Sequence, residues 1–139
     1  MIRRLVVPFA TSAVVFAVII SLVRFAHAQA GPERKFLIEE DLEIPGYQIL
    51  VTTATLGVGE REGRHTHPGT LVGYLLEGQL TLERDGQPPV ALKPGDSILV
   101  KPGQIHEGIN TGSVPTKALA MFVVEKDKPL STPANLAGR

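Results

Sequence analysis

The sequence contains no cysteine among its 139 residues. This absence excludes a disulfide framework, a zinc site built on thiolates and a cysteine nucleophile. The chain also has no net charge, because 14 basic residues balance 14 acidic ones. No run of Lys and Arg alternates with the few aromatic residues, so the sequence gives no support for nucleic-acid binding. A chain of this length is predicted to form one domain.

Three common catalytic motifs are missing as well. No serine lies in a Gly-x-Ser-x-Gly context. The segment Gly57-Val58-Gly59 is not followed by the Lys-Ser/Thr pair of a phosphate-binding loop. The chain also lacks the His-Glu-x-x-His helix motif of zinc proteases. Any chemistry must therefore come from other residues.

Residues 1–28 are predicted to direct the chain out of the cytoplasm. Arg3 and Arg4 precede an apolar run from residue 5 to residue 23, and Ala26-His27-Ala28 offers a cleavage site before Gln29. We expect a cleaved signal peptide and a periplasmic or secreted protein. The apolar run is also long enough to span a bilayer. The alternative is therefore an uncleaved membrane anchor formed by residues 1–28, which would be the only part of the chain in a membrane.

The rest of the chain is mildly acidic. Without residues 1–28 it has 11 basic and 14 acidic residues, a net charge of about −3. Residues 29–46 are predicted to form an N-terminal arm, in which Phe36-Leu37-Ile38 is a short strand or packs against the domain. The acidic residues that follow this apolar group are expected to face solvent.

Residues 47–126 are predicted to form one all-β domain. Short apolar runs recur along this part of the chain, and turn signals containing Gly, Pro or Asp separate them. The runs span residues 47–56, 71–76, 80–82, 90–92, 98–100 and 118–124. No stretch beyond residue 30 has a convincing helical period. We expect an antiparallel sandwich or barrel, followed by a C-terminal tail at residues 127–139 that frays from Thr132.

Three histidines, His65, His67 and His106, are the only ones outside residues 1–28. Each lies beside a glycine-containing turn. His65 and His67 are two residues apart, so on a strand their side chains point to the same face, with Cα atoms roughly 6.5–7 Å apart. Two such imidazoles can hold one metal ion if a third ligand arrives from elsewhere, and His106 is the candidate.

The spacing around these histidines resembles the two motifs of the cupin family. The first motif contains a glycine, His-x-His and a closing glycine, here Gly59, His65, His67 and Gly78. The second contains a glycine, Pro-Gly, a histidine and an asparagine, here Gly95, Pro102, Gly103, His106 and Asn110. The resemblance covers residues 47–124 and is closest to small, single-domain cupins of type 2. It implies a double-stranded β-helix, or jelly roll, and a homodimer.

One position departs from the family pattern. Counted back from Gly78, the carboxylate ligand of the family would fall at position 71, where this chain has Leu71. No carboxylate occurs between His67 and Glu77. The resemblance therefore implies that His65, His67 and His106 are the whole protein ligand set, as in some cupin dioxygenases that use histidines alone.

An all-histidine site constrains the ligand. Three neutral imidazoles leave a divalent ion with its full charge and with three open positions, which favours an anionic, chelating small molecule. Imidazole suits iron, zinc, copper and nickel. The resemblance makes iron(II) the first choice, with zinc, manganese, nickel or copper as alternatives.

Three functions stay open at this point. The first is a metal-dependent dioxygenase or other oxidoreductase that acts on a small chelating organic acid or diketone. The second is a non-catalytic cupin that binds or senses a metal or small ligand, and the third is a cupin isomerase. An acid or base in the cavity would separate them, and the sequence assigns no catalytic residue.

Other residues have simpler interpretations. Glu62 is expected to be a solvated loop charge rather than a neighbour of the metal, and Arg61 a surface charge rather than an anchor for an anionic substrate. Tyr74 either lines the cavity or belongs to the core. Asn110 is expected to satisfy backbone groups at a turn. Glycines 63, 69, 78, 95 and 103 are expected to have positive φ.

Overall fold

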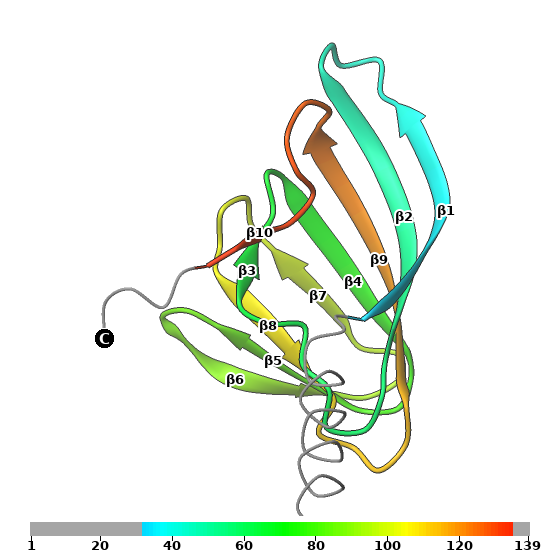
Figure 1. Ribbon diagram of the computed structural model, residues 1–139, viewed down its shortest axis with the longest axis vertical. Coiled ribbons are helices and arrows are strands. Elements are labelled where there is room, and N and C mark those ends of the chain that lie inside the picture. The colour runs from blue at the N-terminus through cyan, green and yellow to red at the C-terminus, as the bar shows by residue number, and fades with distance from the viewer. Residues whose placement is uncertain (1–31, 135–139) are drawn as a thin grey trace, which may run out of the picture. The chain divides into compact units, whose positions relative to one another are not determined.

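The computed structural model describes residues 32–134 (Figure 1). In this range it contains ten strands and no helix. The strands are β1 (Glu33–Asp41), β2 (Tyr47–Leu56), β3 (His65–Thr66), β4 (Thr70–Glu77), β5 (Leu80–Arg84), β6 (Gln87–Leu92), β7 (Ser97–Val100), β8 (His106–Ile109), β9 (Thr116–Glu125) and β10 (Thr132–Pro133). The all-β prediction is confirmed, and every run predicted between residues 47 and 124 lies in a strand.

The strands form two five-stranded antiparallel sheets. The first has the order β1-β2-β9-β4-β7 and the second the order β10-β3-β8-β5-β6. Consecutive strands of the chain often lie in different sheets, which brings residues far apart in the sequence into one site. The predicted arm contains β1, which is a nine-residue edge strand of the first sheet, longer than the short strand expected there.

The core lies on the inner faces of the two sheets. The first sheet contributes one buried cluster, which includes Leu50, Leu71, Val100, Phe122 and Val124. A second cluster combines residues of both sheets, namely Leu75, Leu80, Leu82 and Leu92. Burial of each such side chain contributes roughly 1.5–3 kcal/mol to folding. Among the polar residues buried in this apolar interior are three histidines, which need an explanation.

Tyr74 lies on the outer face of the first sheet, so neither interpretation of it was right. It pairs with Ser97 and Leu119 and is 43% exposed, whereas its neighbour Leu75 is buried. Because side chains alternate along a strand, an inward Leu71 places residue 74 outward.

Two glycines are needed where strands come close together. Four of the five glycines named above have positive φ, and Gly69 is the exception. A Cβ atom on Gly69 would lie 1.9 Å from the carbonyl oxygen of Val123, and one on Gly78 would lie 2.7 Å from the carbonyl oxygen of Pro115. Gly69 was expected to have positive φ, but glycine is required there for another reason. Close packing against β9 excludes a side chain at this position.

Residues 132–134 are more ordered than expected. Thr132 and Pro133 do not fray but pair with Thr66 and His65 of β3. The backbone N–H of Ala134 donates a hydrogen bond to the carbonyl of Arg64, at 2.9 Å. The tail therefore supports the strand that carries His65.

The export segment predicted at residues 1–28 lies outside the described residues. Its cleavage before Gln29 and its use as an anchor both stay predictions. In residues 32–134, no helix has the length and apolar character needed to cross a membrane.

Candidate metal centre

The structure brings His65, His67 and His106 together between the two sheets. His65 and His106 are directly paired across β3 and β8, and His67 follows β3. One ring nitrogen from each histidine lies within 4.8 Å of the others. All three side chains are buried, with at most 7% of each residue exposed.

Backbone carbonyls fix the tautomer of each ring. A carbonyl oxygen can only accept a hydrogen bond, so a ring nitrogen that contacts it must carry the proton. In all three histidines this nitrogen is Nδ1, which leaves a lone pair on Nε2 of the neutral ring. The acceptors are the carbonyls of Gly63 for His65 (2.6 Å), Leu130 for His67 (2.6 Å) and Gln104 for His106 (3.0 Å).

The three Nε2 atoms need a cation. Nε2 of His65 lies 3.3 Å from Nε2 of His67, and two lone pairs cannot form a hydrogen bond with each other. Nε2 of His106 is buried without a hydrogen-bond partner among the described residues. Two nitrogens that bind one ion at roughly 2.0–2.1 Å, with angles near 90–110°, lie about 2.8–3.4 Å apart. The separation of His65 and His67 therefore suits one divalent metal ion that accepts imidazole ligands, and His106 offers a third ligand nitrogen within 4.8 Å of the other two.

Burial keeps the rings in the form that binds metal. It lowers the pKa of His67 from 6.5 to about 4, and it also lowers the pKa of His106. At neutral pH both rings are therefore uncharged, and neutral imidazole is the ligand form.

The metal-free protein should lose stability as the pH falls from 6.5 to 4. In this window His67 takes up a proton in the unfolded chain but not in the folded one, since its pKa is about 4 when folded. The unfolded state then binds more protons, so stability rises with pH. The shift corresponds to about 3 kcal/mol between pH 7 and pH 4. Urea unfolding at both pH values measures it.

The matched comparison for this prediction is His67→Gln, which removes the titrating group. The variant should show a pH dependence smaller by about 3 kcal/mol. An equal pH dependence in the variant and the wild type would show that His67 is not held neutral by burial.

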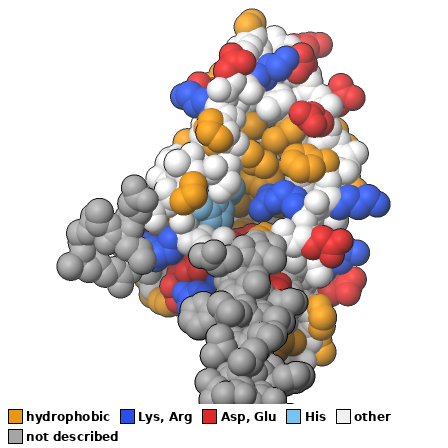
Figure 2. Space-filling view, in the orientation of Figure 1, with side chains coloured by type: hydrophobic (Ala, Val, Ile, Leu, Met, Phe, Trp, Pro, Cys, Tyr) orange, Lys and Arg blue, Asp and Glu red, His pale blue; other side chains and the backbone are white. Residues whose placement is uncertain are grey.

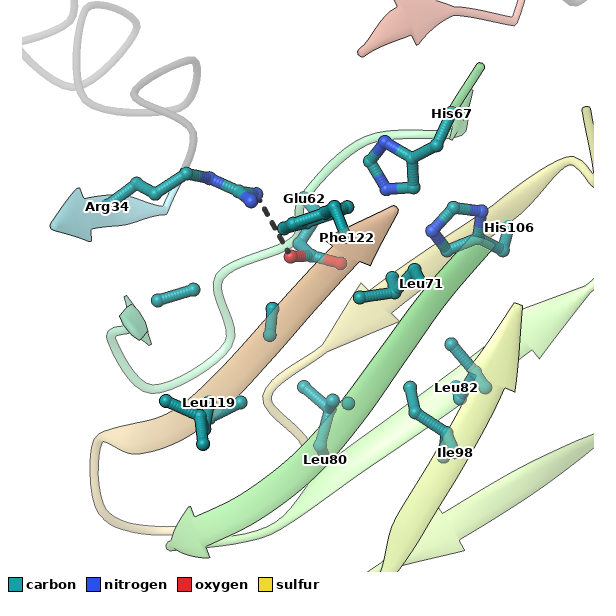
Figure 3. Close-up of a pocket in the computed structure, with 14 residues that line it drawn as sticks. Arg34, Glu62, His67, Leu71, Leu80, Leu82, Ile98, His106, Leu119 and Phe122 are labelled. Atoms are coloured by element: carbon teal, nitrogen blue, oxygen red, sulfur yellow. Dashed lines mark ion pairs between the residues drawn. The ribbon is translucent and has the colours of Figure 1, made fainter. Parts of the chain in front are cut away.

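A cavity of about 50 Å³ lies beside the histidines (Figure 3). One water molecule requires roughly 10–15 Å³ on this scale, so the cavity has room for a small organic ligand. Figure 2 shows a hollow on this face, with hydrophobic side chains inside it and histidine atoms at its edge. The polar residues that line the cavity are Arg34, Glu62, His67 and His106, and most of the others are apolar.

Leu71 faces this cavity from β4, at the position where the family pattern has its carboxylate. Its side chain lines the cavity with His67 and His106 and belongs to the buried cluster that contains Phe122 and Val100. An apolar side chain therefore occupies the place from which a carboxylate would approach the histidines.

Glu62 is not the solvated loop charge expected from the sequence. Its side chain is 18% exposed and lines the cavity. Oε2 accepts a hydrogen bond from the backbone N–H of Gly108, at 3.1 Å. A Cβ atom on Gly108 would lie 2.6 Å from this oxygen, so a larger residue there would require the carboxylate to shift. Nothing in the sequence pairs Glu62 with Gly108, because the fold brings them together.

Arg61 is a surface charge, as expected, with 55% of its side chain exposed, and it also forms an ion pair within the protein. Its Nε and Nη2 atoms donate to the two carboxylate oxygens of Glu107, at 2.9 and 2.8 Å. Glu107 is buried, and the hydrogen bonds from Arg61 lower the pKa of its carboxyl group. The pair fastens the loop that carries Glu62 to β8, next to His106.

Asn110 satisfies backbone groups at a turn, as predicted. Its Nδ2 donates to the carbonyls of Leu56 and Val114, at 3.1 and 2.9 Å, and its Oδ1 accepts from Gly112 N, at 2.9 Å. Its role is therefore structural, at the end of the strand that begins with His106.

Comparison with known proteins agrees with the fold. The chain matches the family model described as Cupin domain over residues 52–122. A search of curated protein sequences found no match. The chain is similar to a Klebsiella pneumoniae protein with a double-stranded β-helix domain, with 21% identity, a TM-score of 0.61 and coverage of 75% of this chain and 87% of that one.

Two further solved structures share the fold. A cupin 2 domain-containing protein from Halorhodospira halophila has 19% identity and a TM-score of 0.62, over 76% of this chain and 72% of that one. The DMSP lyase DddQ from Ruegeria pomeroyi has 18% identity and a TM-score of 0.64, over 95% and 73%. These likenesses confirm the predicted double-stranded β-helix. Since the family model covers more than half of the sequence, the chain belongs to the cupin family.

Proposed function

We propose that this cupin holds one divalent metal ion on His65, His67 and His106 and acts on a small, chelating organic acid or diketone. The observation that supports it is the set of three buried histidines, each of which offers a ligand nitrogen within 4.8 Å of the other two. Iron(II) is the first choice of metal, with zinc, manganese, nickel or copper as alternatives. A bound iron(II) ion would supply Lewis acidity and redox chemistry toward dioxygen, as in a small dioxygenase.

The residues of the chain have separable tasks in this proposal. The carbonyls of Gly63, Leu130 and Gln104 orient the three rings. The apolar lining of the cavity, which includes Leu71, excludes water from the ligand. The carboxylate of Glu62 can accept or hold a proton in the cavity.

Glu62 also supports a second candidate, a metal-assisted lyase or isomerase. Such reactions need an acid or base in the cavity, and Glu62 is a carboxylate that lines it. The DMSP lyase with the same fold makes DMSP one substrate to try. A cupin that only binds or senses its ligand needs neither oxygen nor Glu62.

One experiment separates these functions. Iron(II)-loaded protein is incubated with chelating acids, diketones and DMSP, while oxygen uptake and product formation are measured. Oxygen uptake that requires His106 supports the oxidoreductase. Product formed without oxygen, and lost in Glu62→Gln, supports the lyase or isomerase. Ligand binding without turnover supports a cupin that only binds or senses its ligand. The absence of metal binding overturns the whole proposal.

We also propose that export by residues 1–28 places the protein in the periplasm or outside the cell. The support is the sequence pattern alone. The intact mass of the exported protein decides between the alternatives, because a signal peptide gives a chain that starts at Gln29 and an anchor leaves Met1 or Ile2.

We further propose a homodimer formed by antiparallel pairing of β1 with β1 of a second copy. The strand is the edge of its sheet, and its centre exposes Phe36, Leu37 and Ile38. Lys35 and Glu40 lie on the same face, because they pair with Thr53 and Ile49 of β2 across a bulge. A symmetric register sets each Lys35 opposite the second copy's Glu40.

Charge reversal tests this register. Lys35→Glu and Glu40→Lys should each weaken the dimer by roughly tenfold, because like charges then face each other at two places. The double variant should restore the affinity. Sedimentation equilibrium measures the dissociation constants, and a wild-type protein that stays monomeric, or a double variant no better than the single ones, contradicts the proposal.

A further inference from the structure

Arg34 is the one residue of β1 that is not exposed. Of the nine residues of this strand, eight are exposed and Arg34 is partly buried. It pairs with Ala54 of β2, which is buried on the inner face of the sheet. Directly paired residues share a face, so Arg34 points inward as well. Figure 3 shows it reaching from β1 toward the cavity.

Two neighbours hold the guanidinium in this place. Its central carbon lies 5.6 Å from the centre of the Phe122 ring, which is within the range of a cation–π contact. Nη2 lies 4.0 Å from Oε1 of Glu62, which is too far for a hydrogen bond. Glu62 therefore attracts Arg34 without occupying the pair of parallel N–H donors that a carboxylate takes from an arginine.

Phe122 also connects Arg34 with the histidines. The same ring contacts His67 edge-on, with ring centres 4.9 Å apart. One phenyl ring therefore separates the guanidinium from an imidazole of the candidate metal centre. Arg34, His67 and His106 line one cavity, so a small ligand can contact Arg34 with one end and reach the open metal positions with the other.

We propose that Arg34 binds the carboxylate of the substrate, so that the cavity selects organic acids over uncharged diketones. This inference rests on the proposed function, because it assigns one end of the ligand to the metal. A diketone could fill the metal positions but would leave the paired N–H donors of Arg34 without a carboxylate. A carboxylate joined to the chelating group satisfies both, and it offsets part of the positive charge that the metal brings into an apolar cavity.

Two probes that differ in one group test this selection. Zinc-loaded protein, which has no redox activity, is titrated by calorimetry with 2,4-pentanedione and with 2,4-dioxopentanoate. Both carry the chelating diketone, and a carboxylate replaces one terminal methyl group in the second. Arg34→Gln should reduce the preference for the carboxylate probe by roughly 10–100-fold. Its affinities for zinc and for 2,4-pentanedione should match those of the wild type.

Two more variants make the result specific to Arg34. Lys93→Gln removes one positive charge from an exposed turn and should keep the wild-type preference. Arg34→Lys keeps the charge but loses the planar pair of donors, so it should lose part of the preference, and it decides the matter if Arg34→Gln folds poorly. Full zinc content with an unchanged preference in the Arg34 variants overturns the role of Arg34 and leaves the metal site standing. A wild-type protein that binds no zinc overturns both.

Discussion

Replacing His106 with alanine should lower the affinity for a divalent metal ion by more than about a hundredfold. Loss of an outer residue that only orients a ligand costs roughly 10–100-fold, and His106 is placed to bind the ion directly. Its Nε2 atom has no other partner among the described residues, and the two remaining histidines give too few ligands for a stable site. Competition with a chromophoric chelator measures the change.

The matched control is Thr66→Ala, at the position between His65 and His67. Because side chains alternate along a strand, Thr66 points away from the two rings. The control should bind metal like the wild type, and both variants should keep the β-sheet signal in circular dichroism. A folded His106→Ala protein with wild-type affinity would place the metal elsewhere.

Replacing Leu71 with glutamate should raise the affinity of the protein for metal and lower the stability of its metal-free form. With metal, the carboxylate reaches the histidines from β4 and neutralises part of the charge, so affinity should rise roughly tenfold or more. Without metal, a buried, unpaired carboxylate should destabilise the fold by about 2–5 kcal/mol, because Leu71 belongs to the buried cluster around Phe122. Thermal unfolding with and without zinc measures both effects.

Leu71→Gln has the same size as the glutamate variant and no charge. It should lose stability without gaining metal affinity, and any activity of the wild type should be altered or lost in the glutamate variant alone. Equal metal affinity in the glutamate and glutamine variants would mean that residue 71 does not face the metal, and the assumed register of β4 would be wrong.

The strands were predictable from the sequence because their signals are local, whereas the double-stranded β-helix was predicted from the resemblance to the cupin family. The runs at residues 47–56 and 118–124 form the longest paired strands of the first sheet, and their β-branched residues and flanking turns predict strands without knowledge of their partners. Asn110 was likewise predictable, since its hydrogen bonds at the turn involve residues only a few positions away. The contact of Gly69 with β9 joins distant segments, and its cause was not predictable.

The cavity was harder to predict for the same reason. Arg34 lies in a stretch of charged and apolar residues, and only its pairing with Ala54 turns it inward. Glu62 looks like any loop carboxylate until Gly108 is placed beside it. The carbonyl of Leu130 orients His67 from 63 residues away, in a segment whose composition indicated a loose tail. Each of these contacts joins two segments that are distant in the chain.

The most direct test of the metal site is the metal content of the purified protein. The protein is stripped with a chelator, dialysed against iron(II) without oxygen, or against zinc, manganese, nickel or copper, and analysed for bound metal. One equivalent per chain of at least one of these ions is the expected result, since the three histidines each offer a ligand nitrogen within 4.8 Å of the other two. A folded protein that retains none of these ions would contradict a metal centre at His65, His67 and His106.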